Sequence, residues 1–154
     1  MRRSAWDFTK TRAVFATAET IIVASPTAIA THGAPETPEA LAQRECILFG
    51  EAAGATDWTL TNGVERKTVR VSGRLSCTSL ALCLDAAAGG AGFANVPAFI
   101  ARAMIQAGTV NQVLPDWRSA RVPLRIVYPS KRFMSARLRA FVDEAVAGFA
   151  DVKF

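Results

Sequence analysis

The stretch ETIIVASPTAIATHG, residues 19–33, carries the strongest fold signal in this chain. Its apolar, mostly β-branched run at 21–24 predicts a short buried strand. Ser25 then offers a side-chain oxygen to the free amides of a helix start, and Pro26 suits the first helical position, where its missing N–H has no partner. We expect this helix to end near Gly33, which can adopt a left-handed conformation. A strand that leads directly into a capped helix is the repeating unit of α/β domains.

The same alternation continues outward along the chain. Strands are expected at 46–49, 58–60, 67–71, 74–76, 92–96, 110–114 and 122–128, and helices at 38–43, 79–88, 97–108 and 135–149. Thr37-Pro38 repeats the cap-plus-proline start of Ser25-Pro26. The alternation predicts an α/β fold class.

Glycines predict where strands turn or stop. Asn62-Gly63 predicts a hairpin with a two-residue turn, because both residues tolerate positive φ. Ser72-Gly73 is expected to interrupt the return strand.

The last helix has one apolar stripe and one charged face. Such a stripe is expected to be buried against another element of the fold. The stripe consists of Leu138, Phe141, Val142, Ala145 and Phe149.

Composition limits the possible classes of function. The 154 residues are enough for one core, and 51% are hydrophobic. The net charge of +5 comes from scattered basic residues, which favour a solvated surface over a nucleic-acid patch. Three cysteines without a CxxC pair, and a single histidine, argue against a zinc site. No apolar run approaches the roughly 20 residues of a membrane span.

Catalytic patterns are weak. A nucleophile needs a base beside it, and His32 is the only histidine. It lies beside Gly33 at the end of a predicted helix, where it is expected to interact with the helix carbonyls. The chain is therefore not expected to be an enzyme. A small α/β hydrolase-like enzyme and an exported solute-binding protein remain the alternatives, the second because Arg2 and Arg3 precede an apolar stretch.

A series of short motifs resembles one family. The segments, in order, are IIVASP (21–26) with HGAP (32–35), TPEAL (37–41) with ECI (45–47), VSGRL (71–75), AAAGGAGFANVP (86–97), GTV (108–110) with VL (113–114), YPS (128–130) and RAFVD (139–143). Together they resemble the C-terminal part of the effector-binding, or substrate-binding, domain of LysR-type transcriptional regulators.

The resemblance implies a type 2 periplasmic-binding-protein-like fold. Residues 20–152 would form a partial effector-binding domain, with about 20–116 in the second lobe and 120–152 returning to the first. Residues 1–19 would be unassigned or a remnant of the first lobe. The helix-turn-helix of such regulators has no counterpart here, so the chain is expected to be truncated and to reach DNA only through that absent part.

The resemblance also implies a small-molecule effector, a carboxylate or an aromatic acid, and no cofactor or metal. A cytoplasmic homo-oligomer without membrane contact is expected. In open α/β sheets, ligands lie beyond the carboxyl ends of strands, near helix amides that suit anions. The predicted effector-binding residues are Phe49, Gly50, Ser76, Cys77, Thr78, Ser79 and Asn95.

Overall fold

The chain forms two compact units. The computed structural model describes residues 12–50, 54–119, 121–127 and 135–149. Residues 19–121 make the larger unit, and the two chain ends, 1–18 and 122–154, make the smaller one. The chain therefore passes between the units twice, after Ala18 and after Arg121.

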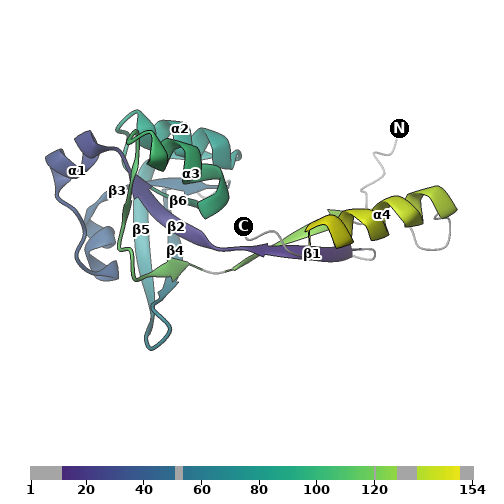
Figure 1. Ribbon diagram of the computed structural model, residues 1–154. Helices are drawn as coiled ribbons and strands as arrows, with labels where there is room; N and C mark the ends of the chain where they lie inside the picture. Colours follow the sequence, from purple (N-terminus) through teal and green to yellow (C-terminus); the bar gives the residue numbers. More distant parts are fainter. Residues whose placement is uncertain (1–11, 51–53, 120, 128–134, 150–154) are drawn as a thin grey trace, which may run out of the picture. The chain divides into compact units, whose positions relative to one another are not determined.

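The smaller unit is a two-stranded antiparallel ribbon with one helix. β1 (Arg12–Ala18) pairs with β9 (Val122–Val127), and α4 (Ala136–Phe149) lies on β1 (Figure 1). The expected helix start is confirmed, because the Ser135 hydroxyl accepts a hydrogen bond from the Leu138 amide at 3.2 Å.

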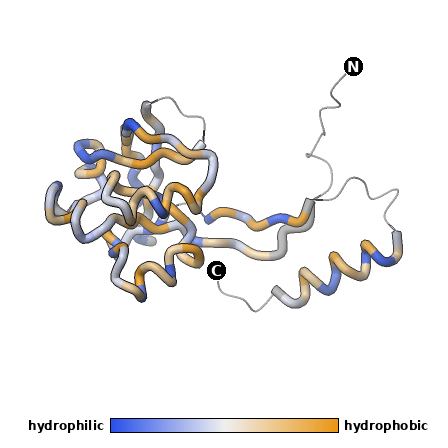
Figure 2. Tube along the Cα trace, turned by 90° about the horizontal axis from the view of Figure 1, so that it is seen from above, coloured by the Kyte–Doolittle hydropathy of each residue, from blue (hydrophilic) through white to orange (hydrophobic). Residues whose placement is uncertain are grey.

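Apolar and charged residues alternate along α4 (Figure 2). Val142 is 5% exposed, whereas Phe141 is 66% exposed. The prediction that Phe141 belongs to the buried stripe is therefore wrong. A two-stranded ribbon is too narrow to cover the whole width of the stripe, and Val142 takes the inner position. The Phe149 side chain lies outside the described residues.

The larger unit is built on a mixed seven-stranded sheet in the order β7-β2-β6-β3-β5-β4-β8. Its strands are β2 (Thr20–Ala24), β3 (Glu45–Phe49), β4 (Ala55–Thr61), β5 (Arg66–Cys77), β6 (Phe93–Pro97), β7 (Asn111–Val113) and β8 (Arg118–Ser119). β3 runs parallel to both β5 and β6, and the other pairs are antiparallel.

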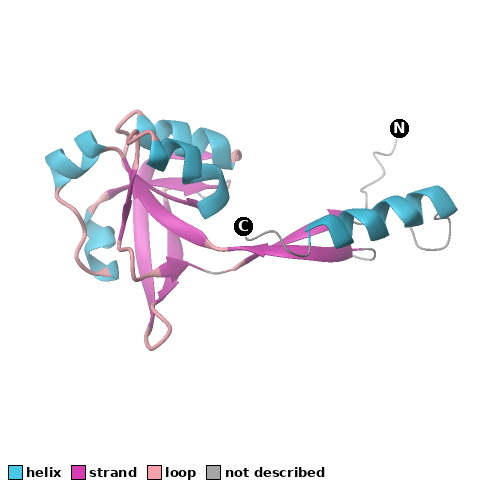
Figure 3. Ribbon diagram, in the orientation of Figure 1, coloured by secondary structure: helices cyan, strands magenta, loops and turns pink. Residues whose placement is uncertain are grey.

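Helices cover both faces of this sheet (Figure 3). α2 (Leu80–Ala88) and α3 (Ala98–Gln106) pack on the face that carries Val23, Ile47 and Val96. α1 (Pro26–His32) and the 3-10 helix η1 (Pro38–Gln43) pack on the other face. Because both faces of the sheet are covered, β2 is buried at all five positions and apolar from Ile21 to Ala24, as the run at 21–24 predicted.

The cap at Ser25 is confirmed, and the helix start at Thr37-Pro38 is confirmed in position but not in its capping hydrogen bond. The Ser25 hydroxyl accepts a hydrogen bond from the Ala28 amide at 3.1 Å, and Gly33 ends α1 with a φ of 77°. Thr37 makes no side-chain capping bond, and the segment after it is a 3-10 helix.

The hairpin of β4 and β5 is confirmed, but its turn differs from the prediction. The last pair is Thr61 with Arg66, so the loop contains four residues. Gly63 has a φ of 91°, whereas Asn62 has no positive φ. The Asn62 side-chain oxygen instead accepts hydrogen bonds from the amides of Val64 and Glu65, at 2.9 and 2.7 Å. These side-chain hydrogen bonds hold the wider loop.

The expected strand break at Ser72-Gly73 is also wrong. β5 runs through both residues and changes neighbours there, pairing with β4 up to Ser72 and with β3 from Ser72 onward. The pairing with β3 shifts register between Ser72 and Leu75. Gly73 therefore belongs to a strand irregularity, which is the second common use of a strand glycine.

Candidate functional site

The carboxyl ends of β3 and β5 form a corner beside the start of α2. The two strands are parallel, and beyond their register shift Phe49 pairs with Cys77. The Gly50 amide donates a hydrogen bond to the Cys77 carbonyl at 2.8 Å, and Gly50 has a φ of 103°. We call this group, residues Phe49, Gly50, Ser76, Cys77, Thr78 and Ser79, the strand-end corner.

Polar groups line the strand-end corner. The Ser76 hydroxyl donates to the Gly50 carbonyl at 2.8 Å, which ties the end of β3 to the end of β5. The Ser79 hydroxyl caps α2 by accepting from the Leu82 amide at 3.5 Å. Ser76, Thr78 and Ser79 are all exposed, so solvent or a ligand can reach their hydroxyls.

An apolar group ends the neighbouring strand of the corner. Phe49 ends a buried strand yet is 51% exposed, and the register places its side chain on the sheet face opposite to that of Ser76. An exposed aromatic ring at the same sheet edge as hydroxyls and helix-start amides suits a ligand with an apolar body and an acidic head. The first turn of α2 contains no acidic residue that would repel such a head.

The thiols near the corner are structural. Cys83 of α2 is 1% exposed, and burial raises its thiol pKa to about 11. The Cys83 thiol points toward the Leu48 carbonyl, 3.9 Å away. Cys77 is partly buried and packs against the α2 and α3 face.

Asn95 lies apart from the other six predicted residues. It is on β6, and continuing the register of β3 with β6 sets it beside Leu48, which pairs with Ser76. Asn95 and Ser76 are thus two strands apart. The Asn95 amide nitrogen donates to the Ser119 hydroxyl at 3.0 Å, and that hydroxyl donates to the Thr59 carbonyl at 3.3 Å.

The hydrogen bonds of Ser119 to Asn95 and Thr59 show that the sheet is curved. Ser119, on β8, is hydrogen-bonded to the Asn95 side chain of β6 and to the Thr59 carbonyl of β4. In the sheet, β6 and β4 are separated by β3 and β5. The edge formed by β4 and β8 must therefore curl over the face on which Asn95 lies. The Asn95 side-chain oxygen is buried and has no hydrogen-bond partner among the described residues.

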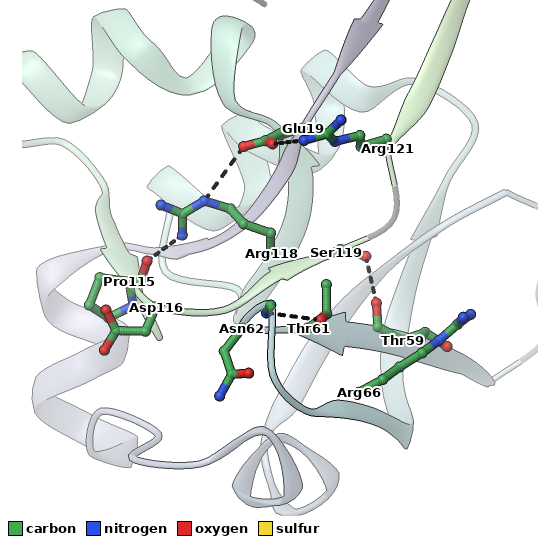
Figure 4. Close-up of a pocket in the computed structure, with 11 residues that line it drawn as sticks. Glu19, Thr59, Thr61, Asn62, Arg66, Pro115, Asp116, Arg118, Ser119 and Arg121 are labelled. Atoms are coloured by element: carbon green, nitrogen blue, oxygen red, sulfur yellow. Dashed lines mark hydrogen bonds and ion pairs between the residues drawn. The ribbon is translucent and has the colours of Figure 1, made fainter.

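A concave feature lies elsewhere within the larger unit, along β8. We call it the arginine pocket; it has a volume of about 760 Å³. Its walls include Glu19, Thr61, Arg66, Arg118, Ser119 and Arg121 (Figure 4). It shares no lining residue with the strand-end corner.

Glu19 organises one wall of the arginine pocket. Its carboxylate forms two ion pairs, with Glu19 Oε1 lying 3.3 Å from Arg121 Nη2 and Glu19 Oε2 lying 3.8 Å from Arg118 Nε. Arg118 also donates to the carbonyls of Pro115 and Trp117. Arg118 is therefore held from three sides, whereas Arg121 keeps a side chain that is 73% exposed.

Sequence analysis missed the arginine pocket. Glu19 and Arg121 are separated by 102 positions, so no local spacing links them. What Glu19 and Arg121 share is that each lies where the chain passes from one unit to the other. The position of these crossings follows from the tertiary fold and is not visible in the sequence.

No group of three or more His, Cys, Asp or Glu side chains placed to hold a metal ion occurs among the described residues. None of the helices in the described part of the chain is long and apolar enough to cross a membrane.

The mixed sheet is covered by helices on both faces, and the ends of β3 and β5 lie beside the start of α2. This architecture is typical of α/β ligand-binding domains. The chain belongs to the LysR substrate binding domain family, whose model matches residues 9–150. The expected fold, type 2 periplasmic-binding-protein-like, is confirmed.

Curated relatives are transcriptional regulators. The chain is 32% identical over 126 residues to the probable regulator LtrA of Klebsiella pneumoniae, covering 80% of this chain and 41% of LtrA. It is also 32% identical to the regulator PtxR of Pseudomonas aeruginosa, covering 69% of this chain and 34% of PtxR. The chain thus spans about two fifths of the length of the curated relatives it matches.

Solved structures agree with this family. Full-length AphB, a virulence activator of Vibrio cholerae, matches 97% of this chain and 50% of its own with a TM-score of 0.74 and 25% identity. The regulatory domain of CrgA from Neisseria meningitidis matches 90% of this chain with the same TM-score and 23% identity, which supports the fold. The matched family is a binding domain of regulators and not an enzyme family, so the hydrolase-like alternative is not supported.

Proposed function

We propose that this chain is the effector-sensing part of a LysR-type transcriptional regulator and that its effector binds at the strand-end corner. The observation that carries the site is the contact of two parallel strand ends, with the Gly50 amide donating to the Cys77 carbonyl at 2.8 Å. This contact sets an exposed aromatic ring, three exposed hydroxyls and the start of α2 along one edge of the sheet.

The proposed effector is a small carboxylate, with an aromatic acid as the preferred class. The amides and positive end of α2 favour a carboxylate, and the ring of Phe49 offers an apolar contact for the body of the ligand. Ser76, Thr78 and Ser79 would supply hydrogen bonds that orient the acid group. Asn95, turned toward Ser119, would contribute to the floor of the sheet rather than to the first contacts.

The remaining parts of the proposal concern the whole regulator. DNA binding would come from a helix-turn-helix outside this chain, as in the relatives named as HTH-type regulators. The regulator would act in the cytoplasm as a homo-oligomer. Residues 20–116 would serve as the second lobe, and 120–152 would return to the first.

A ligand screen with paired variants tests the site. Aromatic and aliphatic carboxylates that bind should raise the melting temperature, because a ligand at 100 times its dissociation constant adds about 2.7 kcal/mol. Ser76→Ala and Phe49→Ala should each reduce this increase. Ser72→Ala is the matched control, since Ser72 is an exposed serine four positions earlier on β5.

The outcome separates the proposal from its alternatives. Equal loss in Ser72→Ala and Ser76→Ala would show that binding does not depend on the strand-end corner. An unchanged melting temperature across the whole screen would remove effector binding by this chain, although its family membership would stand.

A further inference from the structure

We propose that the arginine pocket is a second ligand site, separate from the strand-end corner, and that it takes a small dianion such as a phosphate or a dicarboxylate. This inference is independent of the proposed effector site. It rests on the charges, donors and cavity along β8, within the larger unit alone.

The charge balance of the pocket favours an anion. Arg66, Arg118 and Arg121 face two carboxylates, Glu19 and Asp116, so one positive charge is in excess. Glu19 is engaged by Arg118 and Arg121. Asp116 lies on the opposite side of the pocket from Arg66 (Figure 4). Positive charge is thus in excess around Glu19, where two arginines share one carboxylate, and at Arg66, which has no ion pair among the described residues.

Hydrogen-bond donors accompany this charge. The Asn62 side-chain oxygen is occupied by the amides of Val64 and Glu65, so its NH₂ group is the part left to bind a ligand. Arg121 makes one contact with Glu19 and keeps further N–H groups exposed. Planar guanidinium groups with several parallel donors match carboxylate and phosphate oxygens.

The pocket has the size and rigidity of a ligand site. A volume of about 760 Å³ holds an organic anion with several carbon atoms. Its walls are held by the β4–β8 pairing, by the Ser119 bridge to Asn95 and by the three contacts of Arg118. Donors that are already held in place lose little freedom when a ligand binds.

Arg66 of the arginine pocket lies far along the strand from the strand-end corner. β5 has 12 residues, and Arg66 begins it while Cys77 ends it. At about 3.3 Å per residue these residues are roughly 35 Å apart along the strand. Binding in one site can therefore be distinguished from binding in the other by residue-specific signals.

NMR titration of the 154-residue chain with inorganic phosphate and with malonate tests the inference, with potassium chloride at equal ionic strength as reference. We expect saturable shifts of the amides of Gly63, Arg118 and Ser119 with at least one of the two dianions. The amides of Ser76 and Ser79 should not shift. Arg66→Gln should weaken binding about tenfold, the size expected for one hydrogen-bonded charge.

Two variants keep this test decisive. Arg66→Lys retains the charge and should keep most of the affinity. Arg70→Gln is the matched control, because Arg70 is an exposed arginine on the same strand, paired with Asp57 and outside the pocket. Neither Arg66 nor Arg70 contributes to the core, so folding is not at risk.

Three results would overturn the inference. They are shifts that do not saturate with either dianion, an equal loss of affinity in Arg70→Gln and Arg66→Gln, and saturable shifts at Ser76 and Ser79 in place of Gly63 and Arg118. The last result would assign the anion to the strand-end corner and leave the proposed effector site intact.

Discussion

Gly73 lies against the backbone carbonyl of Cys46, so closely that a β-carbon built on it would come within 1.6 Å of the carbonyl oxygen. Its φ is not in the left-handed region, so the requirement for glycine here is one of space. The contact occurs where the register of β3 and β5 shifts. The irregular pairing that leads to the strand-end corner therefore depends on the absence of a side chain at Gly73.

Gly73→Ala should be strongly destabilising. The added methyl group meets backbone atoms that cannot rotate away, so β3 and β5 would have to separate, and we expect a loss of about 3 kcal/mol or more in the free energy of unfolding. Urea denaturation followed by fluorescence of Trp58 and Trp117, both in the larger unit, measures this loss.

The control for this change is Gly89→Ala. Gly89 ends α2 with a φ of −72°, and the nearest atoms to an added β-carbon are 3.5 Å away. Its effect should stay within about 1 kcal/mol. Similar losses in the two variants would contradict the steric role of Gly73.

The hairpin of β4 and β5 contributes to stability through its inward residues. Leu60 is fully buried, whereas Val64 at the turn is 93% exposed. Leu60→Ala should reduce the free energy of unfolding by about 2 to 5 kcal/mol, because it leaves a cavity in the core. Val64→Ala should be neutral. A Leu60→Ala protein as stable as wild type would mean that the β4–β8 edge is not packed as described.

Cysteine reactivity should follow burial. Cys46 is fully buried and its thiol pKa is raised to about 12 by burial, and burial likewise raises the pKa of Cys83 to about 11. Both thiols should be protonated and unreactive toward iodoacetamide at pH 8 in the folded chain. Partly buried Cys77 should be modified first, as mass spectrometry of peptides can show.

Cys77→Ser is the control for this experiment, and it should leave almost no fast alkylation until urea exposes the other two thiols. Fast modification of Cys46 or Cys83 in the native chain would contradict the buried, structural role given to them.

The ion pair between Glu39 and Lys67 should make stability depend on pH. Glu39 Oε1 lies 2.7 Å from Lys67 Nζ, which joins η1 to β5. The hydrogen bond from Lys67 lowers the pKa of Glu39 below its ordinary 4.5, and the bond to Glu39 raises the pKa of Lys67 above 10.5. A lowered carboxyl pKa adds stability above pH 4.5 that is lost as pH falls through the folded value. A raised amine pKa adds stability below pH 10.5 that is lost as pH rises through the folded value.

Glu39→Gln should therefore lower the melting temperature between about pH 5 and pH 10 and have little effect in strong acid. The effect should be small, because both side chains are partly exposed and salt screens the pair. Glu36→Gln removes a nearby exposed carboxylate and serves as the control. A difference from wild type that grows below pH 4 would contradict this account.

Two glycine-containing pairs, Asn62-Gly63 at the hairpin turn and Ser72-Gly73 within β5, show where local sequence patterns mislead. Asn62-Gly63 favours a two-residue turn, but the hydrogen bonds from Val64 and Glu65 to the Asn62 side chain hold a four-residue loop. Ser72-Gly73 has the composition of a break, but β3 continues the pairing where β4 stops. At Ser72-Gly73 a strand distant in the sequence decided the conformation, whereas at Asn62-Gly63 local side-chain hydrogen bonds decided it.

The sequence alone determined the strand at 21–24, the capped helix after Ser25, the α/β class and the family, because these depend on local spacing and on the order of short motifs. It also indicated the strand-end corner, since the ends of parallel strands meet at one edge of a sheet. Only the tertiary structure decided the curl of the sheet through Ser119, the exposure of Phe141 and the meeting of Glu19 with Arg121. These features join residues far apart in the chain, and no local preference encodes which distant surface a side chain will face.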